Sequence, residues 1–68
     1  MFYPNLEAEM KRNNLNRSDI AKVLGVHVSG VYRMLRGERK ISVSQAKTIR
    51  DSLFPNLKLD YLFDEDPE

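Results

Sequence analysis

The 68-residue sequence has no cysteine and no tryptophan, and it contains only three glycines and three prolines. Without cysteine, neither a disulfide framework nor a thiolate zinc site can form, so stability has to come from packed apolar side chains. A chain of this length can form one small domain at most. The lack of cysteine also fits a reducing compartment, which favours a cytoplasmic location.

Long hydrophobic runs are absent as well. No stretch approaches the about 20 apolar residues that a membrane-spanning helix requires. Residues 1 to 4 lack the basic start and the apolar run of a signal peptide. We therefore expect a soluble protein with no membrane partner.

Residue types that support catalysis or metal binding are sparse. His27 is the only histidine, and no acid and histidine cluster surrounds it in the sequence, so a turn or phosphate contact is the better interpretation of this residue. Clustered carboxylates occur only in residues 64 to 68, and no nucleophile with its base or glycine-rich phosphate loop is recognisable. We predict no enzymatic activity, no catalytic residue, no metal and no cofactor.

The net charge of +1 averages two unlike regions. Four of the ten acids lie in residues 64 to 68, which leaves eleven bases against six acids in residues 1 to 63. We expect residues 1 to 63 to form the domain and residues 64 to 68 to form a disordered acidic tail. Four bases cluster with only Glu38 among them, and this cluster favours phosphate contacts over an ordinary solvated face: Arg33, Arg36, Arg39 and Lys40.

Apolar residues recur at helical spacing between turn residues, which predicts an all-α chain with five short helices. The first should begin at Pro4 and run toward Asn13, and the second should be capped by Asn16 with Asp19 in a capping box. The second helix should cover residues 17 to 24, the third 28 to 36, the fourth 44 to 53 and the fifth about 59 to 63. Ser42 or Ser44 should cap the fourth helix.

Residues 16 to 37 predict two helices joined by a tight turn at Gly25, which is the arrangement of a helix-turn-helix unit. Both helices can share one core because their apolar residues fall on facing sides: Ile20, Ala21 and Leu24, then Val31 and Leu35. Gly30 weakens the second of these helices. Either that helix begins late, near Ser29, or the missing side chain permits a close approach, and we favour the close approach.

These residues resemble the Cro and CI repressor type of helix-turn-helix proteins of phages and bacteria. The resemblance covers nearly the whole chain and rests on residues 15 to 26, 31 to 37 and 59 to 63. Five positions match the family pattern together: Ala21, Gly25, Val26, Val31 and Gly37. The resemblance implies a compact five-helix lambda-repressor-like DNA-binding domain.

The sequence departs from the family pattern at several places. His27 stands where the family usually has a serine or threonine cap, and residues 54 to 56 lengthen the link to the last helix. Met10 and Leu35 occupy the positions of an arginine and glutamate pair found in many members. Because an apolar pair can replace a buried ion pair without loss of stability, we predict that Met10 and Leu35 touch.

The resemblance implies that the start of the third helix enters the major groove of double-stranded DNA. Arg33 is the favoured base reader because a guanidinium can bond both O6 and N7 of guanine, although a phosphate contact is the alternative. Tyr32 could contact DNA or pack on the second helix, and Gly30 could let the backbone sit deep in the groove. The expected base readers are Val28, Ser29, Tyr32 and Arg33, and the expected phosphate contacts are Arg17, Ser18, Arg36, Arg39 and Lys40.

We expect a sequence-specific transcriptional regulator, of the phage or prophage repressor kind, that binds operator DNA as a homodimer in the cytosol of a bacterium or infected host cell. The dimer surface would come from the fifth helix and the apolar ends, unless these residues only close the core: Phe2, Tyr3, Phe54, Leu59, Tyr61 and Phe63. One alternative is a protein-interaction module, such as an antirepressor, a repressor modulator or an antitoxin. Another is that the acidic tail folds over the basic surface and masks it.

Overall fold

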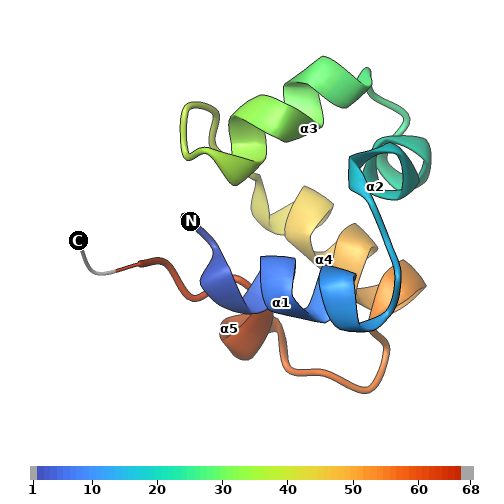
Figure 1. Cartoon of the computed structure of the whole chain (residues 1–68), viewed down its shortest axis with the longest axis vertical. Coiled ribbons are helices and arrows are strands. Elements are labelled where there is room, and N and C mark those ends of the chain that lie inside the picture. Colours follow the sequence, from blue (N-terminus) through green and yellow to red (C-terminus); the bar gives the residue numbers. More distant parts are fainter. Residues whose placement is uncertain (1, 67–68) are drawn as a thin grey trace.

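The structure, a computed structural model, describes residues 2–66, which form five helices and no strand (Figure 1). The all-α, five-helix fold class is therefore confirmed. None of the described helices has the length and apolar character that a bilayer crossing demands. The helices are α1 (Pro4–Arg12), α2 (Arg17–Leu24), α3 (Val28–Leu35), α4 (Val43–Leu53) and α5 (Leu59–Leu62).

The helix starts follow local capping chemistry. Pro4 occupies the start of α1, where its missing N–H costs nothing. Asn16 and Asp19 form the predicted capping box: the backbone N–H of Asp19 donates to the Asn16 side chain at 3.1 Å, and the N–H of Asn16 donates to the Asp19 carboxylate at 2.8 Å. Of the two candidate caps for α4, Ser42 is the one used, because its hydroxyl accepts from the N–H of Gln45 at 3.0 Å.

The turn between α2 and α3 requires a left-handed residue, and Gly25 provides it with φ of 69°. Glycine adopts this conformation without the steric cost that a side chain imposes. The N–H of Val26 donates to the carbonyl of Ala21 at 3.1 Å, which closes the end of α2. Helix α3 therefore leaves the turn packed against α2.

Each helix contributes one almost fully buried side chain to a single core: Leu6, Ile20, Val31, Ile49 and Leu62. Around this centre α2 packs on α3 and α4, while α5 packs on α1 and α4. Met10 and Leu35 are buried in the same cluster and line the same surface groove, and a direct contact between them stays a prediction. Figure 1 shows the consequence for function: α3 lies at the end of the molecule opposite α1 and α5.

Helix α5 is tied to α1 through a polar network centred on Glu9. The Glu9 residue is 5% exposed, and its carboxylate accepts a hydrogen bond from the Tyr61 hydroxyl at 2.8 Å and pairs with Arg12. The side-chain amide of Asn5 also donates to the carbonyl of Tyr61 at 2.8 Å. Tyr61 is therefore engaged within the domain, although the residue remains 39% exposed.

Unlike Tyr61, two other residues of the expected dimer surface are buried. Tyr3 is 5% exposed and Phe54 is 3% exposed, because both belong to the core cluster. The expectation that they form a dimer surface is corrected: their apolar area is used inside the fold. Phe2 and Phe63 are partly buried against the same core.

The C-terminal segment runs back beside the N-terminus. The N–H of Asp66 donates to the carbonyl of Phe2 at 2.9 Å, and the rings of Tyr3 and Phe63 meet edge to face with centroids 5.8 Å apart. The predicted disordered tail spans residues 64 to 68, and its last two residues lie outside the described part of the chain. The domain boundary at residue 63 stays a prediction.

The raised pKa values of two tyrosine hydroxyls, the buried Tyr3 and the partly exposed Tyr61, predict a loss of stability at alkaline pH. The hydrogen bond to Glu9 raises the pKa of Tyr61 above its ordinary value, with burial second. Burial, and then the charge of Glu65, raise the pKa of Tyr3. A raised pKa means that the folded state holds the proton more tightly, so this stability is fully present below about pH 10 and is lost as the pH rises through the raised values.

We therefore expect the thermal midpoint to fall above about pH 10, and to fall less steeply in the Tyr3→Phe/Tyr61→Phe double variant. The measurement is thermal unfolding by circular dichroism at a series of pH values. Comparison with the unmodified chain removes the contribution of the lysines, which both proteins share. An identical decline in the two proteins would show that the tyrosines do not contribute.

Candidate nucleic-acid interface

The outer surface of α3 carries the predicted base readers. The side of α3 that faces the core is buried, and Val31, at 1% exposed, anchors it there. The opposite side consists of exposed residues, which the 3.6-residue period brings together: Val28, Ser29, Tyr32, Arg33 and Arg36. The structure therefore places all four predicted base readers on one surface.

His27 caps α3, which settles where this helix starts. Its Nδ1 atom accepts a hydrogen bond from the backbone N–H of Ser29 at 3.1 Å and lies 2.9 Å from the Ser29 hydroxyl. A ring nitrogen thus takes the place of the hydroxyl oxygen that serine or threonine would supply. The interpretation of His27 as a turn contact is confirmed, and the alternative of a late start near Ser29 is wrong because α3 begins at Val28.

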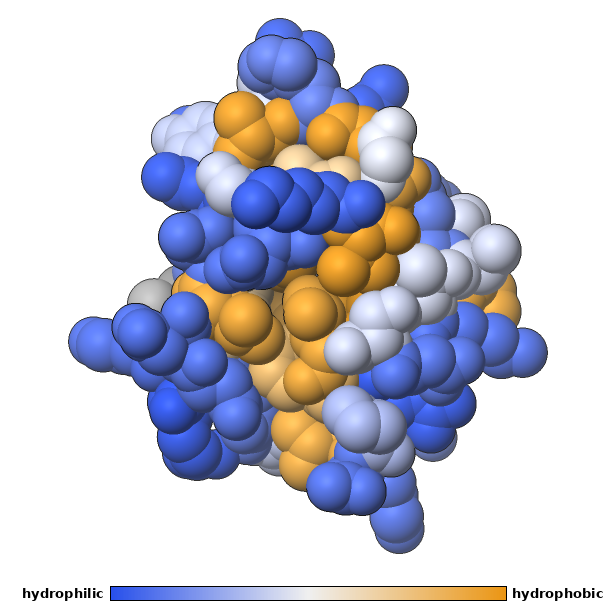
Figure 2. Space-filling view, turned by 90° about the vertical axis from the view of Figure 1, so that its right-hand side faces the viewer, coloured by the Kyte–Doolittle hydropathy of each residue, from blue (hydrophilic) through white to orange (hydrophobic). Residues whose placement is uncertain are grey.

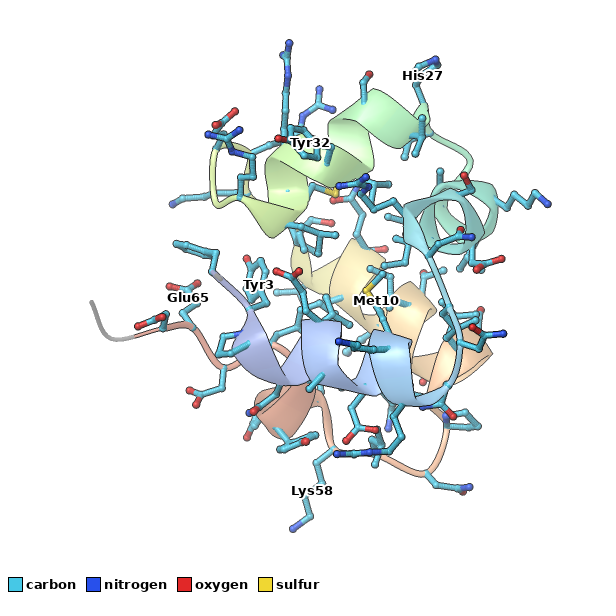
Figure 3. All side chains as sticks on the ribbon, in the orientation of Figure 1. Tyr3, Met10, His27, Tyr32, Lys58 and Glu65 are labelled. Carbon is cyan, nitrogen blue, oxygen red and sulfur yellow. The ribbon has the colours of Figure 1, made fainter. Side chains whose placement is uncertain are left out.

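Two arginines approach the exposed ring of Tyr32, which Figure 3 labels on α3. The guanidinium carbon of Arg17 lies 5.0 Å from the ring centroid, and that of Arg36 lies 5.4 Å away. Arg36 also donates to the Tyr32 hydroxyl at 2.9 Å. Since Arg17 begins α2, the ring holds cationic groups from both helices in one place.

Arg36 is further oriented by the acid that follows it. Its Nε lies 3.0 Å from the Glu38 carboxylate. The hydrogen bond to Tyr32 and the charge of Glu38 both raise the pKa of Arg36. Glu38 thereby offsets one charge of the cluster, which leaves Arg33, Arg39 and Lys40 without an ion pair among residues 2–66.

The start of α2 is less favourable to phosphate than its dipole alone suggests. Arg17 and Ser18 are both exposed, as a phosphate contact requires. However, the Asp19 carboxylate already occupies the first turn and accepts the N–H of Asn16. A phosphate there would meet a negative charge, so the guanidinium of Arg17 is better suited to a phosphate than the start of the helix at Ser18.

Arg39 and Lys40 follow α3 in the loop before α4, and both are exposed. They line a cavity with Phe2, Tyr3 and Glu65, so the acidic C-terminal segment lies beside the basic loop. Figure 3 shows Glu65 close to Tyr3, on the side of the molecule where the loop lies. The close approach expected at Gly30 is to Arg39 of this same loop.

Helix-turn-helix geometry, an exposed helix surface and surrounding cations together define a helix-turn-helix DNA-binding domain. Residues 6–54 match the family model described as helix-turn-helix. The chain belongs to this family, whose Cro and CI repressor type is a DNA-binding one. No match was found among curated proteins or solved structures.

Some interface features were missed from the sequence. In the sequence Glu38 only interrupts the basic cluster, although a separation of two residues from Arg36 is short enough for an ion pair. The stacking of Arg17 on Tyr32 brings together residues from different helices, and no local pattern signals it. His27, by contrast, stands in the sequence at the family's cap position, and it is the N-cap of α3 in the structure.

Proposed function

We propose that the chain is a sequence-specific transcriptional regulator, of the kind that phages and prophages use as repressors, which acts by occupying operator DNA. One observation carries this proposal: α3 presents Val28, Ser29, Tyr32 and Arg33 as a single exposed surface at the edge of the fold. In the family geometry such a helix lies in the major groove, where base edges differ between all four base pairs.

In this mechanism the cations position the domain and α3 reads the sequence. Arg17 and Arg36, held on Tyr32, would contact one stretch of backbone, while Arg39 and Lys40 would contact another. Arg33 is exposed and makes no ion pair among the described residues, so its guanidinium can approach a guanine. The Ser29 hydroxyl lies 2.9 Å from Nδ1 of His27, so this contact orients the hydroxyl at the start of α3.

Binding as a homodimer is part of the proposal. Two half-sites about 34 Å apart would be read by two copies. A surface groove between the start of α4 and α5 supports such pairing through its apolar residues Ile41, Leu59, Phe63 and Val43, the last of which is 70% exposed. Three carboxylates line the same groove, those of Asp60, Asp64 and Glu65. A second apolar band is visible in Figure 2, on the face that lies to the right in Figure 1.

The test is a mobility-shift assay over a salt series, using sequences selected from a random DNA pool. If the four cations Arg17, Arg36, Arg39 and Lys40 each neutralise one phosphate, the logarithm of the affinity should fall with the logarithm of salt with a slope of about −3.6 per chain. Sedimentation with and without DNA would measure the stoichiometry. No binding at low salt would contradict the proposal and favour a protein-interaction module such as an antirepressor or an antitoxin.

The acidic segment next to the basic loop predicts a modest increase in affinity when Glu65 is neutralised. Glu65→Gln should strengthen DNA binding by about 2- to 3-fold at low salt, because a carboxylate beside Arg39 and Lys40 repels phosphate. Asp51→Asn is the matched control, since it removes the same charge from the end of α4, where Asp51 pairs with Arg50. Equal effects of the two variants would indicate net charge alone and would contradict masking by this segment.

A further inference from the structure

Gly30 occupies a position where the backbone does not require glycine. It lies in the first turn of α3, and its φ is not positive, unlike that of Gly25 and Gly37. Alanine is strongly favoured over glycine in such a helical position. Because the backbone does not explain a glycine at this position, the neighbouring atoms should explain why a side chain is absent.

The side chain of Arg39 fills that space. A Cβ built on Gly30 would lie 2.8 Å from Nη1 of Arg39, and no other heavy atom of the described residues comes within 4 Å, apart from the chain neighbours and the backbone of the helix itself. Gly30 is buried although it lies near the helix start. The guanidinium of a loop residue thus lies directly against the backbone of α3.

The position of this guanidinium matters because of what lies next to it. Arg33 follows Gly30 by three residues, so the two are neighbours on the helix surface. Arg39 therefore lies beside Arg33, at one edge of the exposed surface of α3 that carries the predicted base readers. It forms no ion pair there with a carboxylate of residues 2–66, because Glu38 pairs with Arg36 and Glu65 only lines the same cavity as Arg39.

We infer that Gly30 is a positioning residue: its missing side chain provides a seat that holds Arg39 against α3, aimed at a phosphate of the strand that Arg33 reads. This inference rests on the proposed function. An arginine held in one arrangement before binding loses less conformational freedom when it meets a phosphate than an arginine free in a loop. The seat also fixes the loop guanidinium relative to the reading helix.

Gly30→Ala separates this role from a role in folding. The methyl group meets only the far end of a flexible side chain, so the fold should persist, and the thermal midpoint should rise by about 4–8 °C because alanine favours the helix. DNA affinity should nevertheless fall by about 2- to 10-fold as Arg39 is displaced. A more stable protein that binds more weakly cannot be explained by unfolding.

The decisive experiment is a double-mutant cycle on the full chain, with affinities measured by fluorescence anisotropy on a selected duplex. Arg39→Ala alone should weaken binding by about 10-fold or more, and adding Gly30→Ala to it should cause no further loss. Lys40→Ala is the matched control, because this neighbouring cation does not contact Gly30. In the Lys40→Ala background, Gly30→Ala should keep its full effect.

Three outcomes would overturn the inference in distinguishable ways. Unchanged affinity in Gly30→Ala would show that the seat has no role in binding. An equal loss with and without Arg39 would show that the methyl group clashes with DNA directly. Absence of binding by the unmodified chain would overturn the proposed function, and the role of Arg39 as a DNA contact with it.

Discussion

Arg33→Ala should weaken binding to a selected operator by about 1–3 kcal/mol, or roughly 5- to 150-fold, and should relax the sequence preference at one base pair. The guanidinium is exposed on α3 and has no carboxylate partner among the described residues. The helix that carries it is anchored by Val31 and Leu35 in the core. A bidentate contact to guanine would therefore be lost without a change in the fold.

Comparison of several sequences distinguishes base reading from phosphate contact. If Arg33 reads a base, the loss should be large on the selected duplex and small on random DNA, and Arg33→Lys should not restore the preference because lysine lacks the planar fork. Lys58→Ala is the control for net charge, and Figure 3 shows Lys58 at the opposite end of the molecule from α3. An equal loss on every sequence would assign Arg33 to a phosphate.

Local chemistry explains why the helices could be predicted. The box formed by Asn16 and Asp19, the cap at Ser42 and the turn at Gly25 each depend on residues a few positions apart. Such signals are complete within a short window of sequence. The start and end of each helix were therefore predicted to within a residue or two.

Contacts between distant residues could not be predicted in the same way. Glu9 looks like an ordinary exposed helix residue until Tyr61, 52 positions later, donates a hydrogen bond to it. The ring of Phe2 lies against Gly37, and Arg39 lies over Gly30, for reasons that exist only after the helices pack. The scaffold was thus readable from local rules, whereas the arrangement of the cations on it depended on tertiary contacts.

The tertiary contacts of the cations also affect how each of them could meet DNA. The predicted phosphate contacts are not equivalent, because Arg17 and Arg36 share the Tyr32 ring while Arg39 lies on the helix backbone. Arginines held in this way present their donors in set directions. Charge counting from the sequence predicts the salt dependence of binding, but the distribution of contacts along the DNA depends on these arrangements.

Leu6→Ala should unfold most of the protein at 25 °C. Leu6 is fully buried and is the contribution of α1 to the centre of the core. Truncation of a buried leucine costs about 2–5 kcal/mol, whereas a single core in a chain of this size rarely supplies more than about 3–5 kcal/mol. Circular dichroism at 222 nm and urea titration would measure the loss of helix and the fall in the free energy of unfolding.

Val43→Ala is the matched control, because it also removes methyl groups from a helix but at a side chain that is 70% exposed. Its effect on the free energy of unfolding should stay within about 0.5 kcal/mol. Addition of selected DNA at 100 times its Kd should restore about 2.7 kcal/mol to Leu6→Ala by mass action, since only the folded state presents α3. Refolding of this variant on operator DNA but not on random DNA would connect the packing of the core to recognition, and a Leu6→Ala protein as stable as Val43→Ala would contradict the packing of α1.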